Sequence, residues 1–246
     1  MSLSRAILCF NSALPPSIPP WAPSADNNGF RPAGTLFPST SLMRKGDILL
    51  FAALKPNEIQ KRIERQQKRW GSPDEHSRFT HAGLYMGHDH KLFESVPLRG
   101  VRIGSLEDRL AGYCLLVRRV KGLTPVERDN IERESQQWLH TSYGYVSTFL
   151  SLIHPRMAAY WDENVAHELV CSRFCDRAVT NALEETRNAD EIRLHNDSWI
   201  TPANLSESRL LEDVELEWQT MADSRSPAAN PDASALPVDG YHPVDR

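Results

Sequence analysis

The sequence predicts an α+β domain in which an antiparallel sheet packs against helices. Two observations predict this class: short apolar segments bounded by turn residues follow one another between residues 46 and 120, and amphipathic segments with helical spacing come after them. With 40% hydrophobic and 24% charged residues, the composition is typical of a soluble globular protein. At 246 residues, one core with tails is expected rather than two compact domains.

The chain divides into three parts by composition. Residues 1–40 are rich in Pro and Ser without a sustained period, which predicts an extended leader. Residues 41–220 carry the periodic segments and are expected to form the domain. Residues 221–246 turn to Ala, Pro, Asp and Ser, which bury too little apolar surface to repay ordering, so a disordered tail is expected.

Five segments are predicted to be strands. Each is a short apolar run next to turn residues; the runs are 46–51, 79–86, 92–96, 100–104 and 114–120. The turn Gly87-His88-Asp89-His90 joins the second and third of them in a β-hairpin.

Three helices are predicted with defined ends, and a further one with a less defined start. Residues 57–70 have apolar residues at helical spacing, and residues 124–140 open with Thr124, a proline and Glu127, the pattern of a capping box. An apolar helical segment is expected from the Tyr143-Gly144-Tyr145 turn through Ile153. Residues 168–185 form the last helix, whose wide apolar stripe predicts packing into the core.

The charge and the cysteines exclude several classes of protein. A net charge of -4 gives no general attraction to nucleic acid, and the basic segment 61–69 is the one local patch. No signal peptide and no transmembrane helix is predicted, so synthesis in the cytoplasm without stable membrane insertion is expected. The four cysteines, at positions 9, 114, 171 and 175, have no paired spacing and predict reduced thiols.

Cys171 lies in the first turn of the predicted helix 168–185. There, unpaired backbone N–H groups and the positive end of the helix dipole favour a thiolate, as a catalytic cysteine requires. The alternative is a structural cysteine, because cysteine is among the most buried residue types. Cys175, one turn further on, fits the structural interpretation better.

The predicted hairpin supplies a partner base. Strand alternation places His81 on the face opposite to Ala82 and Leu84. A turn centred on residues 88 and 89 pairs Gly83 with Glu94, so Glu94 shares a face with His81 at a diagonal distance of roughly 7 Å between Cα atoms. A carboxylate that orients an imidazole is the usual third member of a Cys-His pair; the alternative is a solvated strand residue.

Four segments together resemble a known family. They resemble segments of the permuted papain-fold group. The four segments are Gly-Asp-Ile-Leu-Leu-Phe at 46–51, Thr-His-Ala-Gly-Leu-Tyr-Met-Gly at 80–87, Phe-Glu at 93–94 and Leu-Val-Cys-Ser-Arg-Phe at 169–174. That group contains the YiiX/YebB-like proteins and is related to NlpC-type cell-wall peptidases and to the lecithin:retinol acyltransferase family. The histidine precedes the cysteine here, as in the permuted branch.

The resemblance implies roles for particular residues. Cys171 would be the nucleophile, His81 the general base and acid, and Glu94 the residue that orients the imidazole. Tyr143, with Tyr145 as a substitute, would help to bind the oxyanion beside the backbone N–H of Cys171; both tyrosines are equally compatible with a core position. Arg173 departs from the small or acidic residue common in relatives.

The expected activity is acyl transfer to water, with no cofactor. By resemblance the leading substrate is a peptide amide of bacterial peptidoglycan, which favours an exported antibacterial effector with a secretion apparatus and an immunity protein as partners. One alternative is a lipid-directed thioesterase, phospholipase or acyltransferase with a groove lined by residues 146–153. Others are a non-catalytic interaction module and a zinc site formed by His76, His88, Asp89 and His90.

Overall fold

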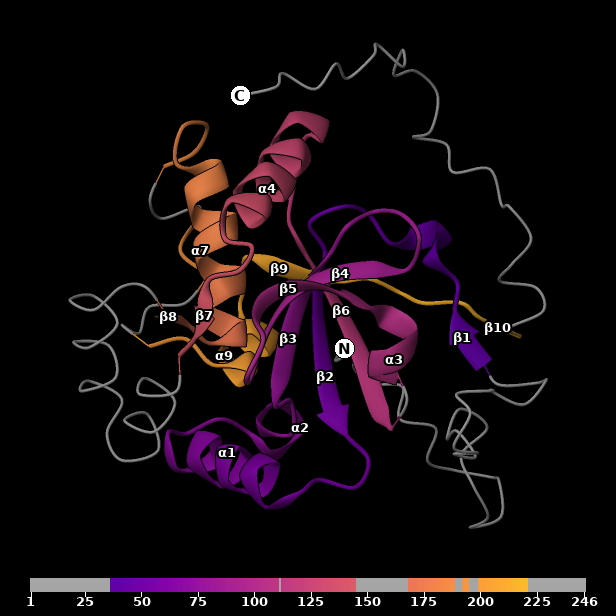
Figure 1. Ribbon diagram of the computed structural model, residues 1–246, viewed down its shortest axis with the longest axis vertical. Helices are drawn as coiled ribbons and strands as arrows, with labels where there is room; N and C mark the ends of the chain where they lie inside the picture. The colour runs from indigo at the N-terminus through magenta and orange to yellow at the C-terminus, as the bar shows by residue number, and fades with distance from the viewer. Residues whose placement is uncertain (1–35, 111, 145–167, 189–191, 195–198, 221–246) are drawn as a thin grey trace, which may run out of the picture.

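A six-stranded antiparallel sheet forms the centre of the molecule (Figure 1). The computed structural model describes residues 36–110, 112–144, 168–188, 192–194 and 199–220. The strands lie in the order β5-β4-β3-β2-β6-β9, with bounds Gly100–Ser105, Lys91–Val96, His81–Tyr85, Ile48–Ala53, Tyr113–Val120 and Leu211–Asp213. Five of these six were predicted, and β9 was not.

Apolar residues cover both faces of the sheet. Along β2, Ile48, Leu50 and Ala52 enter the larger core, while Leu49 and Phe51 enter a second core on the opposite face. This near-continuous apolar run is what a strand buried on both faces requires.

Helices close the larger core on one side of the sheet. α4 (Pro125–Gln137) and α7 (Cys171–Leu183) lie side by side there (Figure 1). The predicted capping box of α4 is present, with Thr124 and Glu127 bonding reciprocally. The helix ends at Gln137, three residues earlier than predicted. α3 (Leu106–Leu110) contributes Leu106 and Leu110 to the second core.

Shorter elements surround the sheet. α1 (Glu58–Arg69) agrees with its prediction, while α2 (Asp74–Ser77) and α9 (Pro202–Glu207) were not foreseen. Buried Gln67 ties these segments together: its amide N–H donates to the carbonyls of Ser77 and Phe79, and its oxygen accepts from the N–H of Ala203. No helix in the described part of the chain is long and apolar enough to cross a lipid bilayer.

Two boundaries differ from the sequence predictions. The strand β1 (Leu36–Pro38) lies inside the range 1–40 assigned to the leader, yet it pairs with β10 (Trp218–Thr220), so the domain starts before residue 40. A 3-10 turn, η1 (Thr40–Leu42), follows it. This pairing joins residues about 180 positions apart, which local composition cannot reveal.

The second difference concerns the helix that carries Cys171. It begins at Cys171 rather than at residue 168, because residues 168 and 169 form β8 (Glu168–Leu169), which pairs in parallel with β7 (Ser142–Tyr143). The hydroxyl of Ser95 donates to the carbonyl of Leu169 at 2.5 Å and helps to hold this segment extended. The predicted helix up to Ile153, the remaining leader at 1–35 and the tail at 221–246 lie outside the described residues.

Candidate active site

Cys171 is the first residue of α7, at the end of the extended segment β8. The preceding residue, Val170, has extended backbone angles (φ -79, ψ 159) and gives the helix no side-chain cap. The first N–H groups of a helix have no partner within the helix. The cysteine thus lies where the helix dipole favours negative charge, as the sequence predicted.

His81 opens β3 and meets Cys171 from the sheet. Its backbone pairs with Phe51 of β2, and the two rings lie with centroids 5.8 Å apart. The Nε2 atom of His81 is 2.9 Å from Oε2 of Glu94, and the imidazole also interacts with the thiol of Cys171 closely enough to shift the pKa of both groups. Two residues that are 90 positions apart in the sequence therefore form one hydrogen-bonded pair.

Glu94 orients the imidazole from β4. The predicted register is confirmed, with Gly83 opposite Glu94 and Leu84 opposite Phe93. Glu94 has no exposed surface. Space for its carboxylate depends on Gly104 in β5, because a Cβ atom there would lie 2.5 Å from Oε1 of Glu94.

Two arginines that were not identified from the sequence complete the surroundings of Glu94. Arg102 donates from Nη2 to Oε1 at 2.8 Å, and Arg109 donates from Nε to Oε2 at 2.5 Å. Arg102 lies directly opposite Glu94 in the β4–β5 pair, so extending the hairpin register by one strand identifies it. Arg109 comes from α3, and no short-range signal places it here.

The charges of this cluster set the pKa of Glu94. Burial of the carboxylate would raise the pKa, but the hydrogen bonds from His81 and Arg109 outweigh burial and lower it to about 2. Glu94 is therefore ionised throughout the range in which proteins work.

The thiol and the imidazole shift each other toward the charged forms. Burial opposes ionisation of both, yet the attraction and the hydrogen bond between them lower the pKa of Cys171 and raise the pKa of His81. Hydrogen bonds with the backbone of Ala82 and Ser172 further lower the pKa of Cys171. The pair consequently favours a thiolate beside an imidazolium, the reactive form of a nucleophilic cysteine.

Cys175 differs from Cys171 in its exposure to solvent and in the direction of its pKa shift. It is fully buried one turn further along α7, and burial raises its pKa well above that of an ordinary thiol. The structural role expected for Cys175 agrees with this environment.

These environments predict selective alkylation. In the native protein near pH 7, iodoacetamide should modify Cys171 at least about tenfold faster than Cys175, because thiolate fraction and access control the rate. Peptide mass spectrometry after limited labelling measures this ratio. The His81→Ala variant is the control, since loss of the imidazolium should slow labelling of Cys171. Equal labelling of both cysteines in folded protein would favour the non-catalytic alternative.

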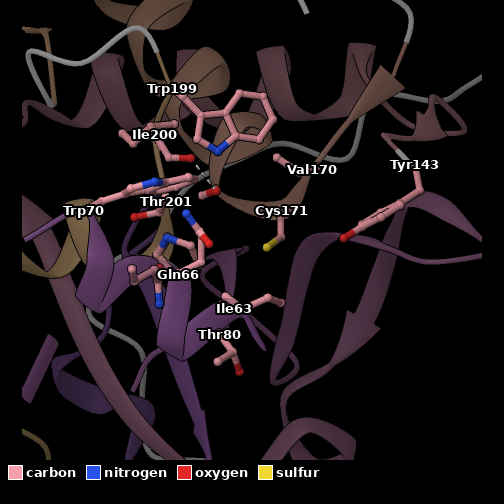
Figure 2. Close-up of a pocket in the computed structure, with 13 residues that line it drawn as sticks. Ile63, Gln66, Trp70, Thr80, Tyr143, Val170, Cys171, Trp199, Ile200 and Thr201 are labelled. Carbon is pink, nitrogen blue, oxygen red and sulfur yellow. Dashed lines mark hydrogen bonds between the residues drawn. The ribbon is translucent and has the colours of Figure 1, made fainter. Parts of the chain in front are cut away.

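A cleft opens at the sulfur of Cys171, and we call it the Cys171 cleft. The space in it that can hold the centre of a water molecule is about 60 Å³, and the cleft is open to solvent. Figure 2 shows Cys171 between Trp70 and Trp199 on one side and Tyr143 on the other, with the Tyr143 hydroxyl directed toward the sulfur. Tyr143 thus lies where the resemblance implied, while Tyr145 lies outside the described residues.

Five segments that are distant in the sequence form the walls of the Cys171 cleft. α1 supplies Ile63, Gln66, Gln67 and Trp70; the segment 199–202 supplies Trp199, Ile200, Thr201 and Pro202; Thr80, Tyr143 and residues 170–172 complete it. The hydroxyl of Ser172 donates to the carbonyl of Ile200 at 2.9 Å and fixes the second wall to α7. Apart from Cys171 itself, the described residues that line the cleft carry no ionisable acidic or basic side chain near neutral pH. No sequence pattern indicated that Trp70 and Trp199, which are 129 positions apart, would meet at this cleft.

Arg173 and the histidines of the zinc alternative lie in other environments. Arg173 forms an ion pair with Asp176 on the same helix at 3.0 Å. His76 is buried and contacts the Ser206 hydroxyl through Nδ1, whereas His88 and His90 flank Asp89 at the β3–β4 turn. The described residues contain no group of three or more His, Cys, Asp or Glu side chains arranged to hold a metal ion, so they lend the zinc alternative no support.

The chain is distantly similar to a solved structure. No family model and no curated protein matches the chain. The crystal structure of metalloprotein yiiX from Escherichia coli O157:H7, described as DUF1105, is similar with a TM-score of 0.47 and 18% sequence identity. The similarity covers 72% of this chain and 98% of that chain. The chain has a distant structural neighbour in this YiiX protein.

Proposed function

We propose that this protein is a cysteine hydrolase that works through a covalent acyl-enzyme on Cys171. The observation that carries the proposal is the continuous hydrogen-bonded series from Cys171 through His81 to Glu94. Nucleophilic catalysis by cysteine needs three parts. They are a thiol at a helix N-terminus, an imidazole next to its sulfur, and an ionised carboxylate that binds the other side of the imidazole.

The geometry supports a two-step reaction. The Cys171 thiolate attacks the carbonyl carbon, and the carbonyl oxygen takes the negative charge in a tetrahedral intermediate. The imidazolium of His81 gives its proton to the leaving group as the bond to that group breaks, which leaves a thioester on Cys171. Neutral His81 then takes a proton from water, the hydroxide attacks the thioester, and the acid product leaves as the proton returns to the pair.

Two groups are placed to stabilise the intermediate. The backbone N–H of Cys171 belongs to the uncapped end of α7, and the hydroxyl of Tyr143 points into the same cleft (Figure 2). Donors directed at a developing oxyanion contribute about 3 kcal/mol each in well-studied enzymes. We assign the oxyanion site to these two donors.

A permuted papain-like core is part of the same proposal. In relatives with the ordinary order, the cysteine helix precedes the sheet that carries the histidine. Here His81 lies in β3 and Cys171 in α7, so the histidine comes first along the chain. The packing of α7 against β3 and β4 of an antiparallel sheet supports this interpretation.

Two substrate classes remain as candidates. A peptide amide of peptidoglycan rests on the motif resemblance, and with it go the expectations of export without a cleavable signal peptide and of an immunity protein as partner. The Cys171 cleft favours the second class, a lipid-directed thioesterase or phospholipase. Its described lining is aromatic, aliphatic and amide in character, which suits an apolar acyl chain better than a charged stem peptide.

Parallel assays with the same preparation test the substrate. We expect release of fatty acid from a palmitoyl thioester to exceed release of peptide fragments from purified sacculi. Ile63→Ala should raise KM for the thioester about fivefold, since removing apolar contacts from the cleft wall costs about 1 kcal/mol.

The same helix offers a matched control for this substitution. Ile59 lies one turn before Ile63 on α1, is 65% exposed and does not line the cleft, so Ile59→Ala should leave KM unchanged. Release of peptide fragments from sacculi without release of fatty acid would select the peptidoglycan candidate instead.

A further inference from the structure

The carboxylate of Glu94 is held by two arginines that differ in one respect. Arg102 reaches Oε1 from β5, on the far side from the imidazole. Arg109 reaches Oε2 from α3, and Oε2 is also the oxygen that His81 contacts. The two cations therefore bind the same residue, but only Arg109 shares an atom with the proposed base.

The surrounding atoms hold the Glu94 carboxylate in place. Glu94 is completely buried, and the side chains of Arg109 and Arg102 are only 21% and 33% exposed. The backbone of β5 at Gly104 closes the remaining space, because even a methyl group there would collide with Oε1. The contacts of Glu94 are consequently a fixed part of the site.

The charged groups around His81 act in opposite directions. Cys171 from α7 and Glu94 from β4 attract the imidazolium, whereas Arg109 from α3 repels it. The neighbour from β2 is the uncharged ring of Phe51. Since the paired cation offsets part of the charge of the carboxylate, the imidazolium is held less strongly than by Glu94 alone.

We propose that Arg109 is a positioning residue that limits how far Glu94 stabilises the His81 imidazolium, whereas Arg102 only anchors the carboxylate. The inference rests on the proposed role of His81 as base and acid. In acylation one ring proton of His81 must move to the leaving group, while the proton on Nε2 stays on the ring and is donated as a hydrogen bond to the Glu94 carboxylate. A less strongly stabilised imidazolium gives up that proton more readily, which speeds departure of the leaving group.

Titration of His81 by NMR tests the proposal without a substrate. The full-length Cys171→Ala protein is the background, because it removes the charge of the thiolate, and the His81→Asn variant assigns the resonance. Arg109→Gln should move the titration of His81 to higher pH by about half a unit or more, since a repelling charge is lost. Arg102→Gln, which removes the same charge from the other oxygen, should move it less than half as far.

Arg109→Lys provides the second measurement. It keeps the positive charge, so the titration of His81 should stay near that of the background protein. This measurement can be made even if Arg109→Gln fails to fold. Any of three results would overturn the proposal. They are an unchanged titration midpoint of His81 in Arg109→Gln, equal shifts of that midpoint in the two glutamine variants, and a shift in Arg109→Lys as large as in Arg109→Gln. Absence of turnover in the wild-type protein would instead contradict the hydrolase function, because the titration requires no turnover.

Discussion

Replacing Cys171 with alanine should abolish turnover, with kcat/KM lower by at least about a thousandfold. The nucleophile is lost, and water cannot substitute for it because the other groups of the site are arranged around the sulfur. The fold should persist, since alanine is a good helix former at the start of α7 and the change removes a single buried atom. Activity assays and thermal denaturation of the same preparation measure both effects.

Cys175→Ala is the matched control for this substitution. It removes a thiol from the same helix, one turn away, that burial keeps in the neutral form. We expect activity close to wild type with some loss of stability, since the side chain belongs to the main core. His81→Ala should lose activity as Cys171→Ala does. Wild-type activity in Cys171→Ala would show that the proposed mechanism is wrong.

Replacing Glu94 with glutamine should have the largest effect on stability. The amide keeps the shape of the side chain but leaves Arg102 and Arg109 without their buried counter-ion. Breaking a buried ion pair by removing one partner costs about 3 kcal/mol or more, and loss of the orienting carboxylate should lower kcat about a hundredfold or more. Urea denaturation and steady-state kinetics measure the two effects.

The dependence of stability on pH follows from the same residue. The pKa of Glu94 is lowered in the folded protein from 4.5 to about 2. Its contribution to stability is therefore fully present above about pH 4.5 and is lost as the pH falls toward 2, a difference of roughly 3 kcal/mol. In Glu94→Gln the free energy of unfolding should fall less steeply over this range. Glu185→Gln, at an exposed position after α7, should retain the wild-type slope; parallel slopes for wild type and Glu94→Gln would contradict the assignment.

The parts of the site that depend on near neighbours in the chain could be predicted from sequence patterns alone. A two-strand register set by the 87–90 turn brings Glu94 opposite Gly83 and hence beside His81. The capping box at Thr124 starts α4, and α7 carries Cys171 in its first turn. These features arise from hydrogen bonds and side-chain alternation over a few residues, which a sequence pattern records directly.

The contacts between distant segments became known from the folded structure and not from any sequence pattern. The contact of Cys171 with His81 requires the apolar stripe of α7 to pack on the sheet, and Arg109 reaches Glu94 because α3 folds back from β5. The Cys171 cleft joins Trp70 to Trp199 through the bonds of Gln67 and Ser172. Such contacts are selected by the fit of whole surfaces in a closely packed interior, and no short pattern along the chain specifies that fit.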